Sequence, residues 1–104
     1  MKIIKVKTTD RFQNPHGVEA KKIYETNKAN VVHMTLNPGE SLKKHTTPTD
    51  VFFYVLEGEG VVEIGDEKQT VSADMLIDSP AGTPHCWYNE SPDVLKFLVV
   101  KLSQ

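Results

Sequence analysis

The sequence lacks the features that mark several large classes of protein. It has a single cysteine, Cys86, which rules out an internal disulfide and the cysteine-rich zinc frameworks. No segment approaches the roughly 18 consecutive apolar residues that a membrane-spanning helix needs. Lys2, Lys5 and Lys7 interrupt the apolar N-terminus, so it does not have the pattern of a signal peptide. These absences predict a cytoplasmic protein that has no membrane partner.

An excess of positive charge is also missing. The chain has 12 Lys and Arg against 14 Asp and Glu, a formal net charge of -2. Such a balance gives no field that would attract a phosphate backbone, so nucleic acid is not expected as a partner. The sequence also contains no G-x-S-x-G elbow, no phosphate-binding G-x4-G-K-[ST] loop and no H-E-x-x-H zinc motif.

The chain does contain a regular series of short β-type segments. Segments rich in Val, Ile, Phe and Thr recur about every ten residues, with Gly, Pro, Asn and Asp between them, and helical periodicity is hard to find. About ten strands are predicted, including an opening strand at Ile3–Val6 and a closing strand at Val94–Leu102. With 104 residues, the chain is expected to form one all-β domain over residues 1–104, a sandwich or barrel.

The clearest pattern lies in residues 51–71. The apolar run of residues 51–57 is followed by two further strand-like segments with Gly-containing turns between them, which predicts a meander of three paired strands. Because successive side chains of a strand alternate between its faces, Val51, Phe53 and Val55 share one face, which is predicted to line the barrel interior.

The same alternation applies to the strand predicted at residues 85–88. It places His85 and Trp87 on one face, predicted to be the inner one, and turns Cys86 and Tyr88 the other way. Cys86 is interpreted as a small buried hydrophobe rather than as a redox group.

Two blocks of residues have a more specific spacing. The first covers residues 39–58 and contains Gly39, His45, Thr47, Val51 and Gly58. The second covers residues 74–89 and contains Asp74, Pro80, Gly82, His85 and Asn89. The blocks follow the two cupin motifs, G-x5-H-x-H-x3-4-E-x6-G and G-x5-P-x-G-x2-H-x3-N. The chain therefore resembles a small single-domain cupin of the conserved-barrel type, which implies a jelly-roll barrel, also called a double-stranded β-helix.

The resemblance also implies a site, and the chain departs from it. In the family, two His and one Glu of the first motif and one His of the second converge on a metal inside the barrel. Here the second His position is Thr47 and the Glu position is Val51, which leaves His45 and His85. A divalent transition metal such as Zn, Fe, Mn or Ni would need a third protein ligand. His33 and Asp50 are the candidates.

Three functional hypotheses follow. The leading one is a cupin that binds a small molecule without an assignable reaction. His45 and His85 would be its polar anchors, and the other predicted ligand-binding residues are Thr47, Val51, Phe53, Val55 and Trp87. The alternative is a metal-dependent enzyme, dioxygenase-like or isomerase-like, that uses His45, His85 and a third ligand. In the third, side chains fill the barrel and it binds nothing. Whether the protein is an enzyme stays open.

Two further expectations concern the surface. His16 lies in a polar loop and is expected to touch only solvent. The resemblance implies a homodimer, and the apolar terminal segments at Ile3–Val6 and Leu95–Val100 are expected to form sheet edges that association would cover.

Overall fold

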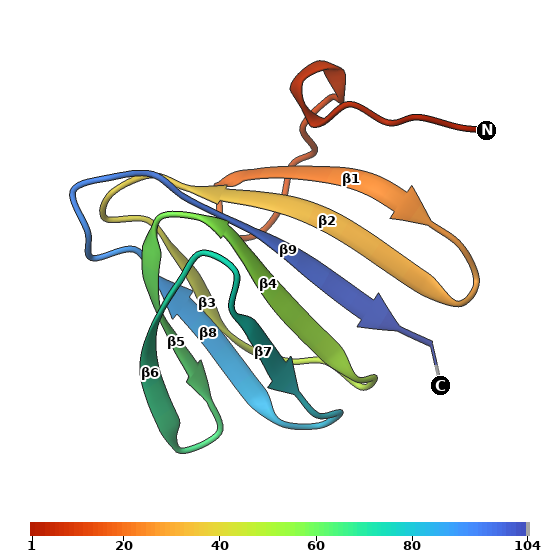
Figure 1. Ribbon diagram of the computed structural model, residues 1–104. Coiled ribbons are helices and arrows are strands. Elements are labelled where there is room, and N and C mark those ends of the chain that lie inside the picture. The colour runs from red at the N-terminus through yellow and green to blue at the C-terminus, as the bar shows by residue number, and fades with distance from the viewer. Residues whose placement is uncertain (104) are drawn as a thin grey trace.

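The structure is a computed structural model that describes residues 1–103, and its regular secondary structure is almost entirely β-strand (Figure 1). After a 3-10 turn, η1 (Val6–Thr8), come nine strands: β1 (Glu19–Glu25), β2 (Ala29–Leu36), β3 (Ser41–Thr46), β4 (Val51–Glu57), β5 (Glu59–Ile64), β6 (Glu67–Ser72), β7 (Leu76–Ser79), β8 (Pro84–Tyr88) and β9 (Leu95–Leu102).

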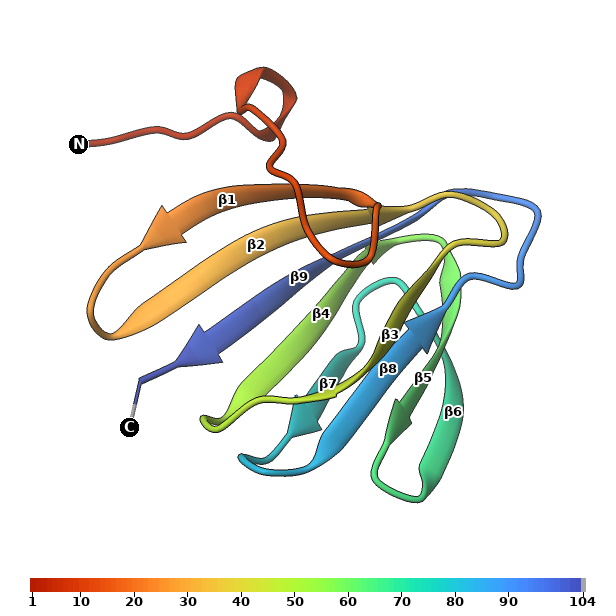
Figure 2. The ribbon, with the colours of Figure 1, turned by 180° about the vertical axis from the view of Figure 1, so that it is seen from behind.

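The strands form two antiparallel sheets that face each other (Figures 1 and 2). One sheet has five strands in the order β1-β2-β9-β4-β7, and the other has four in the order β3-β8-β5-β6. The chain passes repeatedly from one sheet to the other, so most neighbours in a sheet are distant in sequence. This arrangement is the jelly-roll barrel that the sequence predicts, and the all-β prediction is confirmed.

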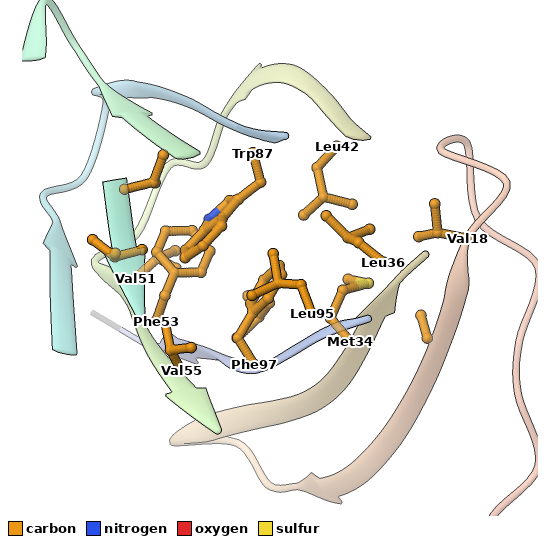
Figure 3. Close-up of a cluster of buried hydrophobic side chains, with 14 residues drawn as sticks. Val18, Met34, Leu36, Leu42, Val51, Phe53, Val55, Trp87, Leu95 and Phe97 are labelled. Atoms are coloured by element: carbon orange, nitrogen blue, oxygen red, sulfur yellow. The ribbon is translucent and has the colours of Figure 1, made fainter. Parts of the chain in front are cut away.

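Side chains fill the space between the sheets (Figure 3). The prediction that Val51, Phe53 and Val55 face the interior is confirmed, because all three are at most 1% exposed. Trp87 is fully buried and stacks on Phe97, with the ring centroids 4.1 Å apart. The centre of the barrel is therefore a packed core, and any space for a ligand lies toward its edge.

Gly58 sits where the chain leaves the five-stranded sheet after β4 and enters the four-stranded sheet at β5. Its φ is +86°, a conformation that side-chain-bearing residues rarely adopt, and a Cβ added there would lie 2.3 Å from the backbone oxygen of Val94. This crossing therefore requires glycine.

Several sequence predictions about strands were wrong. Ile3–Val6 is not a strand: the chain is irregular up to Lys5, and Val6 begins η1. The expected strand edge at Leu95–Val100 belongs to β9, which lies between β2 and β4 inside the five-stranded sheet.

The predicted three-stranded meander is wrong in part. β5 and β6 pair as expected, whereas β4 pairs with β7 and β9 because Gly58 redirects the chain into the opposite sheet. Residues 1–103 form nine strands, which agrees with the prediction of about ten. Within residues 1–103, no helix has the length and apolarity that a membrane span requires.

Candidate functional site

His45 owes its inward direction to a β-bulge in β3. Leu42 lies opposite Trp87 and His45 opposite His85, so two residues of β3, Lys43 and Lys44, match one of β8. In a regular strand, His45 would face the opposite side from Leu42. The extra residue in the bulge turns the ring back toward the interior, against His85.

Four polar groups form a hydrogen-bonded row. The Oγ of Ser79 lies 2.8 Å from Nδ1 of His85, Nε2 of His85 lies 3.2 Å from Nε2 of His45, and Nδ1 of His45 lies 2.9 Å from the carbonyl oxygen of Lys43. A carbonyl oxygen only accepts, so Nδ1 of His45 carries a proton. In the neutral pair, His85 therefore donates from Nε2 to His45, and Ser79 donates to Nδ1 of His85.

Burial keeps His85 neutral. The side chain is 3% exposed, and removal from water, together with the nearby His45 and Lys101, lowers its pKa to about 4. Its ring also lies edge-on to Phe53, with the centroids 5.3 Å apart. At neutral pH, His85 is thus a fixed, uncharged partner that orients His45.

A cavity of about 460 Å³ lies beside His45, between β1 and β2 on one side and β3 on the other. Its apolar wall is made by Ala20, Val32, Met34 and Leu42, and the loop before β1 contributes Phe12, Asn14, Pro15 and His16. The remaining lining residues are Lys43, Lys44, His45 and Lys101. Apolar walls with a few convergent polar groups are typical of a small-molecule pocket.

The expectation that His16 touches only solvent was wrong. Its Nδ1 accepts a hydrogen bond of 2.9 Å from the backbone N–H of Lys43, and its ring centroid is 5.4 Å from that of His45. The backbone of Lys43 in the bulge thus connects both imidazoles, since its N–H binds His16 and its C=O binds His45. No local pattern around His16 points to this contact, because the loop and β3 are far apart in sequence.

The other predicted ligand-binding residues lie elsewhere. Val51, Phe53, Val55 and Trp87 belong to the packed core and do not line the cavity beside His45. Thr47 follows β3 and is buried, and its backbone oxygen accepts a hydrogen bond from the Gly82 N–H. The structure therefore brings together His45 and His85 from the predicted set and adds His16.

Neither candidate for a third metal ligand joins the histidine pair. In β2 the side chains of Met34 and Leu36 enter the core, so His33 faces the outer side of the five-stranded sheet. The Oδ1 of Asp50 accepts a hydrogen bond of 2.8 Å from the backbone N–H of Ala81 and so braces the loop before β8.

The donor set does not fit the metal centre that the family resemblance implies. Catalytic metal sites normally use three protein ligands, and among residues 1–103 no three His, Cys, Asp or Glu side chains gather in a way that could hold a metal ion. The Glu position of the first motif is occupied by Val51, a buried hydrocarbon side chain with no donor atom. We therefore assign no chemistry to a metal.

A second polar cluster lies on the outer face of the four-stranded sheet. The thiol of Cys86 lies 2.8 Å from Oε2 of Glu63, and the hydroxyl of Tyr88 donates to the same oxygen over 3.1 Å. Burial and the Glu63 carboxylate raise the pKa of the Cys86 thiol, which disfavours the reactive thiolate. Cys86 is buried, as predicted, but it is hydrogen-bonded rather than purely hydrophobic.

Two facing antiparallel sheets and a pair of inward histidines, one from each motif block, define a double-stranded β-helix barrel protein. The chain belongs to the cupin family, since the family model described as "Cupin domain" matches residues 32–101. A search of curated proteins found no match.

Solved structures with the same fold are numerous. The TT1209 protein of Thermus thermophilus is 32% identical, with 98% of this chain and 97% of that chain covered and a TM-score of 0.85. A Thermotoga maritima protein described as a predicted oxalate decarboxylase is 24% identical, with 98% and 100% covered and a TM-score of 0.86. The polyketide cyclase RemF of Streptomyces resistomycificus is 20% identical, with 100% and 80% covered and a TM-score of 0.87. The last two are named for different functions, and both show the fold alone.

Proposed function

We propose that this cupin binds a small molecule in the cavity between β1, β2 and β3, without a resident metal. The observation that carries the proposal is the cavity itself, about 460 Å³ in volume, with an apolar wall on one side and histidines on the other. Space of this size is within the range of small-molecule sites, whereas side chains fill the centre of the barrel.

The histidine row holds the polar side of the site in a fixed geometry. Ser79 and His85 are buried behind His45, so they orient its ring without reaching the ligand themselves. His16 and His45, which line the cavity, offer polarisable rings to the bound molecule. Preorganised groups of this kind improve affinity because less freedom is lost on binding. We assign no reaction to the site.

Filling the cavity tests the proposal. Val32 points toward it, and the substitution Val32→Phe should occupy part of the space. Wild-type protein is screened by thermal unfolding against small acids, amides and amines that share the same set of apolar groups. A ligand at about 100 times its Kd adds roughly 2.7 kcal/mol to the free energy of unfolding and raises the Tm by several degrees.

The matched control is Val61→Phe, since Val61 lies opposite Tyr88 on the outer face of the four-stranded sheet. We expect ligands to raise the Tm of wild type and of Val61→Phe, and to have little effect on Val32→Phe. If no compound stabilises the wild type, or if both valine variants respond like the wild type, the proposed pocket is wrong.

A further inference from the structure

The cavity has a charge pattern that the chain as a whole does not share. The chain has a formal net charge of -2, yet the residues that line the cavity include three lysines, Lys43, Lys44 and Lys101, and no Asp or Glu. His16 and His45 lie on the same lining. Positive charge is thus concentrated beside an apolar wall.

Lys101 is the lysine whose position is most informative. In β9 the side chains of Leu95, Phe97 and Val99 enter the core, and Lys101 is the next residue on that face. It lies opposite Val51 in β4 and Asn30 in β2, at the end of the barrel where the cavity opens. The inner face of β9 therefore has apolar side chains up to Val99 and a charged one, that of Lys101, at its end.

No carboxylate side chain in the described part of the chain pairs with this lysine. Among residues 1–103, no Asp or Glu oxygen lies within 4.0 Å of its ammonium group, whereas Lys96 on the outer face of the same strand reaches Glu57 at 4.0 Å. The positive field of Lys101 extends into the site: after burial, it is among the causes that lower the pKa of His16 and His85.

From this arrangement we infer that the ligand is a small organic acid, whose carboxylate binds the ammonium of Lys101 and whose apolar body lies against Val32, Met34 and Leu42. This inference rests on the proposed function. A charge-assisted bond between ammonium and carboxylate is about twice as strong as a neutral hydrogen bond. It strengthens further beside an apolar wall, where the local dielectric constant is low. An amine of the same shape would be repelled by the lysines.

Matched probes separate the anion inference from the existence of the pocket. Binding is measured by calorimetry for hexanoate, benzoate and phenylacetate, for the amide of each acid, and for hexylammonium and benzylammonium. We expect at least one acid to bind about tenfold more tightly than its amide, because an ionic contact replaces a neutral one. The ammonium compounds should bind most weakly, and added salt should reduce the preference for the acid.

Two lysine variants on one strand identify the partner of the carboxylate. Lys101→Gln should remove most of the preference for the acid while amide binding is unchanged, since the direct ionic contact is lost. Lys96→Gln removes a charge from the outer face of β9 and should behave like the wild type. Lys101 is exposed, so its variant is expected to fold, which its Tm checks.

Equal binding of acids and amides, or an acid preference that survives Lys101→Gln, overturns the anion inference and leaves the pocket in place. If only amides or amines bind, and Val32→Phe blocks their binding, the anion inference is likewise overturned and the pocket is retained. If no probe of any charge binds, the anion inference is overturned and the proposed function fails with it.

Discussion

At the scale of single residues, His85 is a base that the fold keeps uncharged. Its pKa falls from the ordinary value of 6.5 to about 4, mainly through burial and then through His45. Well above pH 6.5 the ring is neutral in both the folded and the unfolded chain. As the pH falls from 6.5 toward 4, the unfolded chain binds a proton that the folded chain does not, so the folded state loses stability.

We therefore expect His85→Gln to flatten the pH dependence of stability. Between pH 6.5 and pH 4.5, the free energy of unfolding of the wild type should fall relative to that of the variant by roughly 1 kcal/mol per pH unit. Urea unfolding at a series of pH values measures this. His16 and His33, whose pKa values are also lowered by burial, remain in both proteins and cancel in the difference. Parallel pH profiles would show that His85 is not the group that titrates.

The residues of the site differ in how far the sequence could identify them. His45 and His85 stand at motif positions, and the structure places their rings in contact. His16 could not be found, because its contact depends on the path of a loop packed against β3. Alternation in β4 predicts that Val51, Phe53 and Val55 line a ligand pocket. It identifies correctly which side chains face the interior, but it cannot distinguish a filled core from an open pocket.

At the scale of elements, Gly58 controls the crossing between the two sheets. Alanine there must adopt a positive φ and also place its Cβ 2.3 Å from the backbone oxygen of Val94. Gly82 is a matched control: its φ is +78°, but nothing lies within 4 Å of an added Cβ. The comparison separates steric overlap from conformational cost.

We expect Gly82→Ala to lower the free energy of unfolding by about 1 kcal/mol and Gly58→Ala by about 3 kcal/mol or more. Denaturant unfolding of both variants checks the difference. If Gly58→Ala is insoluble while Gly82→Ala folds, the order still holds. Equal losses would mean that the chain around Val94 moves away without cost.

The position of a strand within its sheet explains which strands could be predicted. β2, β4 and β9 have strong apolar patterns because they lie inside the five-stranded sheet. β1 and β3 are edge strands, each with one buried residue, Ala20 and Leu42, so their sequences are mostly polar and give a weak strand pattern. Both also contain a bulge, which breaks the two-residue period on which strand prediction depends.

At the scale of the whole molecule, the outer face of the five-stranded sheet is unusual for a surface. Phe52 and Tyr54 of β4 and Leu98 and Val100 of β9 lie there, so these central strands are apolar on both sides. An antiparallel sheet with one face in water normally has polar side chains on that face, so we expect this apolar outer face to be covered. The terminal segments do not form the expected edges, so we attribute the expected homodimer to this face instead.

Two polar groups on β2 are buried at this face without partners in the described part of the chain. His33 and Thr35 lie on this outer face and are each 7% exposed, and Nδ1 of His33 and Oγ1 of Thr35 have no hydrogen-bond partner among residues 1–103. Buried polar atoms without partners are costly, by about 1–3 kcal/mol each. A second copy, related by a two-fold axis, would cover the apolar residues of this face.

We therefore expect a homodimer that uses this face, and Leu98 at its centre provides the test. Leu98→Glu places a charge on the outer face without entering the core, so it should give a monomer. Val61→Glu, on the outer face of the other sheet, should leave the dimer intact. Light scattering at micromolar concentration measures the mass of each. A monomeric wild type contradicts the dimer itself, and a dimer that persists in Leu98→Glu contradicts the face, since a buried unpaired charge at the centre of an interface costs several kcal/mol.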